Sequence, residues 1–238
     1  MTAIDFDAVT VLTFDCYGTL IDWETGIISE LRKVIPSDGV SDEALLDAYG
    51  AEEARLEAGA YVPYREVLRR AMTAVAEASG VEPTIEQARA FESTVVEWPA
   101  FRDSVEALAR LRTRFRLGVL TNCDDELFAH TNRRLAEPFD WVITAEQLQS
   151  YKPNPRNFVQ ALERIGEPRA RVVHVAQSLF HDHAPAQKLG LRTVWINRRH
   201  DRPGTGATPA ASADPDMTFT DMKSFAAFAV PQGITSRG

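Results

Sequence analysis

Hydrophobic and polar positions follow two alternating patterns along much of this chain. Short runs rich in β-branched residues predict buried strands at 9–14, 117–120, 171–176 and 193–196, with a weaker candidate at 141–144. Apolar residues at helical spacing predict helices at 104–113, 125–135, 155–165 and 183–189. Because strands and helices alternate, we expect a parallel sheet with right-handed crossovers, that is, a Rossmann-like α/β core.

A long segment after the first strand departs from this alternation. It contains no strand pattern, only helical patterns separated by proline and glycine, at 26–34, 42–58, 64–78 and 86–97. Helices inserted after the first strand predict a helical cap over a sheet domain. We expect a core of residues 1–21 and 99–238 and a cap of residues 22–98, with hinges near Asp22 and Pro99 that let the cap open and close.

Composition and charge narrow the class of protein. The 238 residues carry a formal net charge of −8, which argues against nucleic acid as a partner. No apolar run has the length of a membrane span, and the first residues, MTAIDFDAV, lack the features of a secretion signal. The two cysteines, Cys16 and Cys123, suit reduced thiols in the cytosol. We expect a cytoplasmic protein without membrane contact.

Polar residues that could take part in catalysis or binding follow the predicted strands at their carboxyl ends. They are Asp15, Thr121 with Asn122, Lys152 and Asp182. Because the carboxyl ends of parallel strands meet at one edge, where open α/β sheets bind ligands, we expect these side chains to lie close together. A carboxylate such as Asp15 can form a covalent ester with a substrate, and Lys152 would keep it ionised.

The remaining members of this set suit supporting roles. The hydroxyl of Thr121 and nearby backbone amides offer donors to an anionic substrate group. Asp182 would position Lys152, bind a metal or orient the hydrolytic water.

Four segments in order, FDCYGT, LTN, YKPNP and the acid of SLFHD, resemble the motifs of the haloacid dehalogenase superfamily. The chain is most similar to the L-2-haloacid dehalogenase branch, and YKPNPRNF and WINR strengthen that similarity. The resemblance implies three catalytic residues, Asp15, Lys152 and Asp182. It also implies substrate-binding roles for Tyr17, Thr19, Thr121 and Asn122. We expect Gln177 and His181 to bind substrate as well. The resemblance implies a small anionic substrate, no cofactor or metal, and a possible homodimer.

Tyr17 distinguishes between the chemistries of this superfamily. The phosphatases have a second aspartate at this position, two residues after the nucleophile, which protonates the leaving alkoxide. Tyrosine, with a pKa near 10, is a weak substitute for that acid. A halide leaves without a proton, so Tyr17 favours hydrolytic dehalogenation of a short 2-haloacid, with a 2-hydroxy acid as the product.

The sequence departs from the dehalogenases at positions that shape the substrate pocket. The stretch LLDAYGAEEARLEAG has no arginine where those enzymes carry one for the halide, and Arg55 lies further along. Leu179, Phe180 and His181 stand in place of their Asn-x-Trp, and Gln177 stands in place of a serine. These departures concern the substrate and leave the attack chemistry intact.

Two alternative functions remain open at this point. One is another hydrolase of the superfamily, either a phosphatase with Mg²⁺ held by Asp15, the Tyr17 carbonyl and Asp182, or an enzyme that cleaves another carbon–heteroatom bond. The other is a non-catalytic binder of small molecules. The pair His181 and His183 lacks the further ligands of a metal site.

Side chains of the predicted cap also have two interpretations. Residues that would either line a cleft or serve helix packing and surface charge are Arg55, Tyr61, Tyr64 and Arg65.

Overall fold

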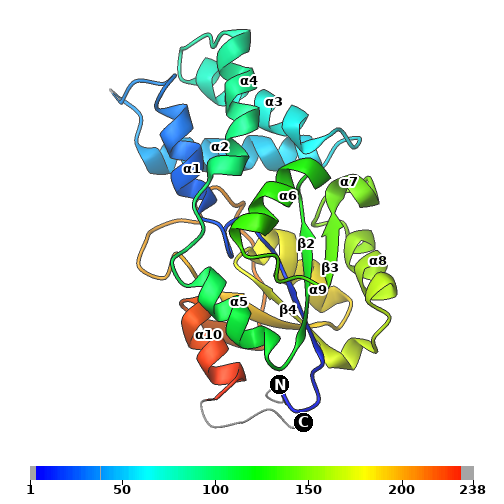
Figure 1. Ribbon diagram of the computed structural model, residues 1–238. Coiled ribbons are helices and arrows are strands. Elements are labelled where there is room, and N and C mark those ends of the chain that lie inside the picture. Colours follow the sequence, from blue (N-terminus) through cyan, green and yellow to red (C-terminus); the bar gives the residue numbers. More distant parts are fainter. Residues whose placement is uncertain (1–3, 38, 232–238) are drawn as a thin grey trace.

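The computed structural model describes residues 4–37 and 39–231, and its centre is a six-stranded sheet with the order β3-β2-β1-β4-β5-β6 (Figure 1). Every pair of neighbouring strands is parallel. The strands are β1 (Val11–Phe14), β2 (Arg116–Thr121), β3 (Trp141–Thr144), β4 (Val172–Ala176), β5 (Arg192–Ile196) and β6 (Met217–Phe219). This is the predicted Rossmann-like core, and its strand order reverses at β1, between β2 and β4. Ligands of doubly wound sheets bind in the crevice at that reversal.

Alternate residues of the strands point to opposite faces of the sheet, where helices cover them. In β1, Val11 belongs to a small hydrophobic cluster with Phe158 of α8, while Leu12 and Phe14 belong to the main core. The main core continues through α5 and α10 into the inserted helices. The helices of the sheet domain are α5 (Ser104–Arg112), α6 (Asp125–Arg134), α7 (Ala145–Leu148), α8 (Pro155–Ile165), α9 (Ala184–Lys188) and α10 (Met222–Ala229).

The segment inserted after β1 is helical, as predicted, and lies beyond the carboxyl edge of the sheet (Figure 1). Hydroxyl or carboxylate caps are present at the starts of several of its helices: Asp22 accepts a hydrogen bond from the backbone of Thr25, and Ser41 accepts one from Ala44. Its helices are α1 (Trp23–Leu31), α2 (Asp42–Glu57), α3 (Tyr64–Ala78), α4 (Ile85–Ser93) and the 3₁₀ turn η1 (Thr94–Glu97). Because of its Asp22 cap, α1 starts three residues before the predicted start at 26.

The two segments that connect the inserted helices to the sheet domain lie side by side. The backbone N–H of Asp22 donates to the carbonyl of Pro99 at 2.8 Å, and Ile21 forms an antiparallel bridge with Ala100. The boundaries of the cap at residues 22 and 98 remain a prediction, and this paired crossing is where we expect the hinge.

Several elements do not follow from the sequence patterns, among them the short helix α7 and a 3₁₀ turn at Arg169–Arg171. The strand β6 and the helix α10 lie beyond the predicted loop at 200–216, and β6 has three residues that are only partly buried or exposed, too few for a period to show. The segment Leu179–His183, designated η3, forms a π-helical turn before α9 begins, where the spacing predicts a helix from 183.

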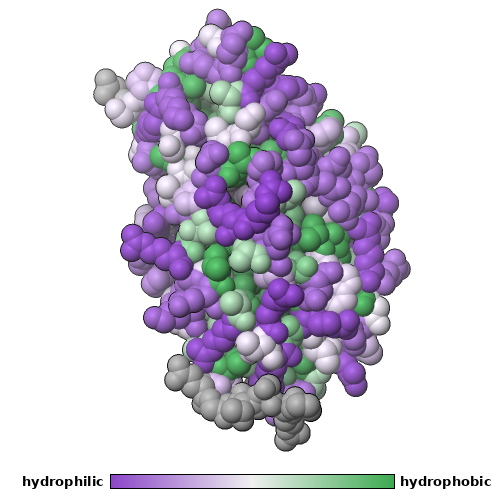
Figure 2. Space-filling view, in the orientation of Figure 1, coloured by the Kyte–Doolittle hydropathy of each residue, from purple (hydrophilic) through white to green (hydrophobic). Residues whose placement is uncertain are grey.

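Polar side chains cover most of the face in Figure 2, and hydrophobic ones form small separate groups on it. No helix in the described part of the chain is long and apolar enough to cross a membrane.

Candidate active site

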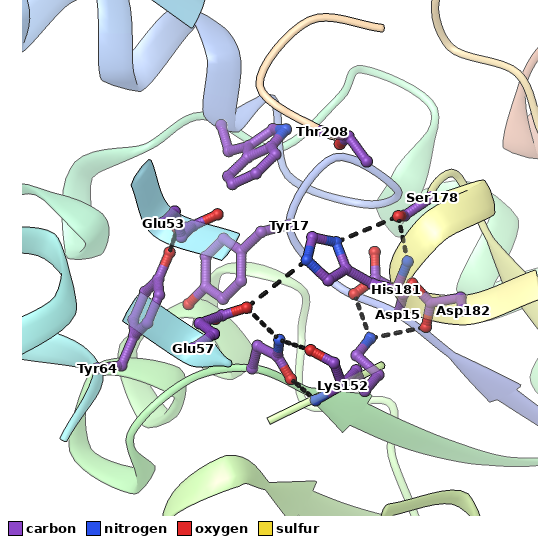
Figure 3. Close-up of a pocket in the computed structure, with 12 residues that line it drawn as sticks. Asp15, Tyr17, Glu53, Glu57, Tyr64, Lys152, Ser178, His181, Asp182 and Thr208 are labelled. Atoms are coloured by element: carbon purple, nitrogen blue, oxygen red, sulfur yellow. Dashed lines mark hydrogen bonds and ion pairs between the residues drawn. The ribbon is translucent and has the colours of Figure 1, made fainter. Parts of the chain in front are cut away.

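Side chains from both parts of the chain line a cavity of about 30 Å³ at the carboxyl edge of the sheet (Figure 3). The sheet domain contributes Asp15 from the end of β1, Lys152 from the loop after α7 and Asp182 from η3. The inserted helix α2 contributes Glu53 and Glu57. The full lining is Asp15, Tyr17, Trp23, Glu53, Glu57, Tyr64, Asn122, Lys152, Ser178, His181, Asp182 and Thr208.

Asp15 is held by a cation and a hydroxyl, one on each carboxylate oxygen. The ammonium of Lys152 donates to Oδ1 at 2.9 Å, and the hydroxyl of Thr19 donates to Oδ2 at 2.7 Å. Asp15 is 7% exposed, and its backbone N–H donates to the carbonyl of Val175 in β4. The carboxylate is therefore fixed in position at the point where the strand order reverses.

Lys152 lies between two carboxylates in the interior. It also donates to Oδ1 of Asp182 at 2.7 Å, and it is 1% exposed. Oδ1 of Asp182 also contacts Nε2 of His174 at 2.9 Å, whose Nδ1 contacts the hydroxyl of Thr13 at 2.9 Å. A histidine inside the apolar strand β4 is the sequence feature that indicates this buried partner, which the motifs alone do not reveal.

These contacts determine the charges of the site. Burial raises the pKa of Asp15, and the charge of Lys152 opposes the rise. Burial would also raise the pKa of Asp182, but Lys152 and His174 hold it well below its usual range. Burial lowers the pKa of Lys152, but the charges of Asp15 and Asp182 outweigh it and raise that pKa above the ordinary value. Lys152 is thus a permanent cation.

The hydroxyl of Tyr17 points away from this group of charges. It forms a hydrogen bond with the hydroxyl of Thr131 at 2.9 Å and accepts one from the Cys123 thiol at 3.4 Å. Its ring meets that of Trp98 edge to face, with the centroids 5.8 Å apart. Tyr17 therefore lines the cavity with its ring and presents no acid to a substrate.

Asn122 and Thr121 lie at the end of β2 in different situations. The side-chain amide of Asn122 donates to the carbonyl of Lys152 and to Oε2 of Glu57, both at 3.0 Å. It also accepts from the backbone N–H of Lys152 at 2.8 Å. Thr121 is 1% exposed, and its hydroxyl has no hydrogen-bond partner among the described residues.

Gln177 and Thr19 are joined behind the nucleophile. The backbone N–H of Gln177 donates to the hydroxyl of Thr19 at 2.9 Å, so the loop after β4 supports the residue that binds Asp15. The side chain of Gln177 borders two other surface cavities and is absent from the wall around Asp15. The structure thus brings all the predicted site residues to one sheet edge, with Thr19, Thr121 and Gln177 behind the cavity wall.

The cap wall of the cavity carries residues that the sequence motifs miss. Oε1 of Glu53 accepts hydrogen bonds from the hydroxyls of Tyr64 at 2.9 Å and Tyr49 at 3.2 Å. Oε2 of Glu57 lies 3.6 Å from Nε2 of His181. Tyr49, Glu53 and Glu57 are spaced four residues apart, so one face of α2 carries all three, and this spacing is the available sequence indication.

The two arginines that the sequence suggested as cleft residues of the cap do not line the cavity. Arg55 pairs with Glu52 on the surface, with 67% of its side chain exposed, and Arg65 pairs with Glu126 of α6. Among the predicted cleft residues of the cap, Tyr64 lines the cavity, while the ring of Tyr61 stacks on Tyr151.

One oxygen of each carboxylate assigned to Mg²⁺ in the phosphatase alternative contacts a cation of the protein itself. The two carboxylates assigned to that ion, Asp15 and Asp182, both bind the ammonium of Lys152. Within residues 4–37 and 39–231, no three or more His, Cys, Asp or Glu side chains form a group that could hold a metal ion. Nε2 of His183 is bound to the carbonyl of Ala176 at 2.9 Å.

The family model of the haloacid dehalogenase-like hydrolases matches residues 9–187, from just before β1 into α9. The chain belongs to this family. This membership confirms the resemblance found in the four motifs, and with it that the protein is a hydrolase of the haloacid dehalogenase superfamily.

Relatives of this haloacid dehalogenase-like hydrolase match most of its length. An (S)-2-haloacid dehalogenase from Pseudomonas putida is 26% identical over 195 residues, which are 79% of this chain and 85% of that protein. (S)-2-haloacid dehalogenase 4A from Burkholderia cepacia is 27% identical over 205 residues, 83% of this chain and 87% of that protein. The structure of L-2-haloacid dehalogenase from Xanthobacter autotrophicus shares the fold, with a TM-score of 0.79 at 17% identity over 95% of this chain and all of that one.

Proposed function

We propose that this hydrolase removes halide from a short 2-haloacid and releases a 2-hydroxy acid. The observation that carries the proposal is the carboxylate of Asp15, buried at the carboxyl edge of β1 and held by Lys152 and Thr19. The relatives from Pseudomonas putida and Burkholderia cepacia, both (S)-2-haloacid dehalogenases, support the same chemistry.

The reaction has two steps on Asp15. A carboxylate oxygen of Asp15 attacks the carbon that bears the halogen, and the carbon–halogen bond breaks with its electron pair going to the halide. Water then attacks the carbonyl carbon of the resulting ester and frees the 2-hydroxy acid. Asp182 suits the second step, because it lines the cavity and its Oδ2 has no hydrogen-bond partner in the described part of the chain. Lys152 remains protonated throughout and balances the carboxylates.

The position of Tyr17 supports halide as the leaving group. Its hydroxyl is engaged with Thr131 and Cys123, so it offers no proton to an alkoxide.

The thiols of Cys16 and Cys123 are free and buried, which suits a reducing cytoplasm.

Repeated turnover in ¹⁸O-labelled water tests the proposal. The protein is incubated with chloroacetate or (S)-2-chloropropionate, with and without EDTA, and the peptide that contains Asp15 is analysed by mass. We expect product, ¹⁸O in Asp15 and no effect of EDTA, while Asp15→Asn forms neither product nor label. Product formed without label in Asp15 would contradict the ester route. Metal-dependent release of phosphate from a phosphate ester, without turnover of either haloacid, would favour the phosphatase alternative.

A further inference from the structure

The cap wall of the active-site cavity carries acidic residues, although a departing anion is stabilised by positive charge or by hydrogen-bond donors. Glu53 and Glu57 of α2 face the cavity that contains Asp15 (Figure 3). Among the described residues that line it, Lys152 alone carries a permanent positive charge, and Asp15 and Asp182 already bind that charge.

Nucleophilic displacement of the halide at carbon directs the leaving group to the cap wall of the cavity. The leaving atom departs on the side of the carbon opposite to the attacking oxygen. Asp15 belongs to the end of β1 in the sheet domain, whereas Glu57 belongs to the inserted helix α2 across the cavity. A halide expelled by Asp15 therefore moves toward the cap side of the cavity, to which Glu57 belongs. An ionised Glu57 would repel that halide, whereas a protonated Glu57 would donate a hydrogen bond to it.

The surroundings of Glu57 favour its protonated form. Its side chain is 3% exposed, and Oε2 accepts from the amide of Asn122 at 3.0 Å, while no hydrogen bond within the described residues involves Oε1. Burial, and next the charge of Glu53, raise the pKa of Glu57 well above its usual range. Asp15 adds to this rise, and Lys152 and Asn122 oppose it. The acidic proton then belongs on Oε1.

His181 adds a second donor that has no acceptor in the protein. The hydroxyl of Ser178 accepts from the backbone N–H of His181 at 2.8 Å, so its own hydrogen is available to Nδ1 at 3.2 Å. The remaining ring nitrogen, Nε2, then carries the proton. His181 is 8% exposed and lines the cavity, yet Nε2 has no hydrogen-bond partner among the described residues, and Oε2 of Glu57 lies 3.6 Å away.

The charge on His181 follows from its surroundings. Burial lowers the pKa of His181 to about 4, with Asp182 and Lys152 acting in opposite senses. The imidazole is therefore neutral near pH 7, and Nε2–H is a donor that faces the cavity without a partner. Such a donor requires an acceptor from a ligand.

We propose that Glu57 and His181 form the leaving-group site of this enzyme, and that they favour a leaving atom that accepts a strong hydrogen bond, fluoride above all, over chloride and bromide. This inference rests on the dehalogenation proposed above and assigns its substrate class as 2-fluoroacids.

Glu57 keeps its proton through both steps. As Asp15 bonds to carbon and the carbon–fluorine bond breaks, the electron pair goes to fluoride, which leaves as an anion and accepts hydrogen bonds from Oε1–H of Glu57 and Nε2–H of His181. When water cleaves the ester, one of its protons ends on the hydroxyl of the 2-hydroxy acid and the other passes to solvent by way of Asp182. Fluoride is the smallest and most basic of the halides, so it gains more from these donors than chloride or bromide does.

The test compares two substrates that differ only in the leaving atom, fluoroacetate and bromoacetate. We measure kcat/KM for both with the native enzyme, with Glu57→Gln, which keeps the acceptor for Asn122 but replaces the carboxylic O–H with a much weaker amide donor, and with Glu52→Gln as the control. Glu52 lies on the same helix and pairs with Arg55 at the surface. We expect Glu57→Gln to lower kcat/KM for fluoroacetate by about tenfold or more, because a strong hydrogen bond to the departing anion is weakened, with a much smaller loss for bromoacetate. Glu52→Gln should change neither value.

A second measurement does not depend on turnover. We compare the melting temperatures in sodium fluoride and in sodium bromide at equal ionic strength for the native enzyme and for Glu57→Gln, because the general effect of each salt on stability is common to both proteins. We expect the difference between the two salts to be larger for the native enzyme than for Glu57→Gln. Equal losses for the two substrates in Glu57→Gln would overturn the leaving-group site while the proposed dehalogenation stands. If neither haloacetate gives a 2-hydroxy acid, the dehalogenation is wrong, and a fluoride shift that depends on Glu57 still supports the site. A difference between the two salts that is equal in the native enzyme and in Glu57→Gln would overturn it.

Discussion

The side chain of Asn122 forms two hydrogen bonds with the backbone of Lys152. Its amide nitrogen donates to the carbonyl of Lys152 at 3.0 Å, and its Oδ1 accepts from the N–H of Lys152 at 2.8 Å. The end of β2 therefore fixes the loop that carries the cation of the active site. Since the same amide also donates to Glu57 of α2, Asn122 connects Lys152 to the cap.

Asn122→Ala should weaken both catalysis and stability. The variant leaves the N–H and carbonyl of Lys152 without partners in a buried place, which costs about 1–3 kcal/mol of unfolding free energy. A shift of Lys152 relative to Asp15 should lower kcat by about 100-fold, with a smaller change in KM. Steady-state kinetics and urea unfolding measure both effects. An unchanged kcat would show that Lys152 keeps its position without Asn122.

Lys152→Met should abolish turnover and destabilise the fold. It leaves the carboxylates of Asp15 and Asp182 buried without their shared cation, and breaking a buried pair in this way costs about 3–5 kcal/mol. Lys188→Met, at an exposed position at the end of α9, is the control and should change neither property. Residual activity within tenfold of the native value would contradict a role for Lys152 in keeping Asp15 ionised.

The sequence predicted the sheet edge of the site better than its cap wall, for a physical reason. Asp15, Lys152 and Asp182 follow strands or their loops, and parallel pairing brings such positions together whatever the packing. Glu57 lies on a helix of the inserted segment, and only the docking of that segment on the sheet decides which turn of α2 faces Asp15. His174 is hidden for a similar reason, because its partner Asp182 lies on another element.

Glu53→Gln should stabilise the protein at alkaline pH and have little effect at acidic pH. Burial raises the pKa of Glu53 from 4.5 to about 7, so the native state holds this proton more tightly than the unfolded state. That contribution is fully present below pH 4.5 and is lost as the pH rises through 7. Glutamine keeps the oxygen that accepts from Tyr49 and Tyr64. At pH 8 we expect a gain on the order of 2 kcal/mol.

Urea unfolding at pH 5 and pH 8 measures this difference, with Glu52→Gln as the comparison. A gain of equal size at both pH values would show that the effect of Glu53→Gln is unrelated to titration. A loss at pH 8 would mean that the carboxylate of Glu53 is stabilised in the native state.

Tyr17→Phe should retain turnover and lose some stability. The hydroxyl of Tyr17 contacts Thr131 at 2.9 Å and the Cys123 thiol at 3.4 Å, and neither residue lines the cavity. Phenylalanine keeps the edge-to-face contact with Trp98 but leaves the Thr131 hydroxyl without its partner, which costs about 1 kcal/mol. Kinetics with chloroacetate and thermal unfolding measure the two effects. Because halide leaves without a proton from Tyr17, kcat should stay within about tenfold of the native value, whereas a single missing general acid costs about 100-fold or more. A loss of that larger size would place the hydroxyl in the chemistry and would reopen the question of which leaving group the enzyme serves.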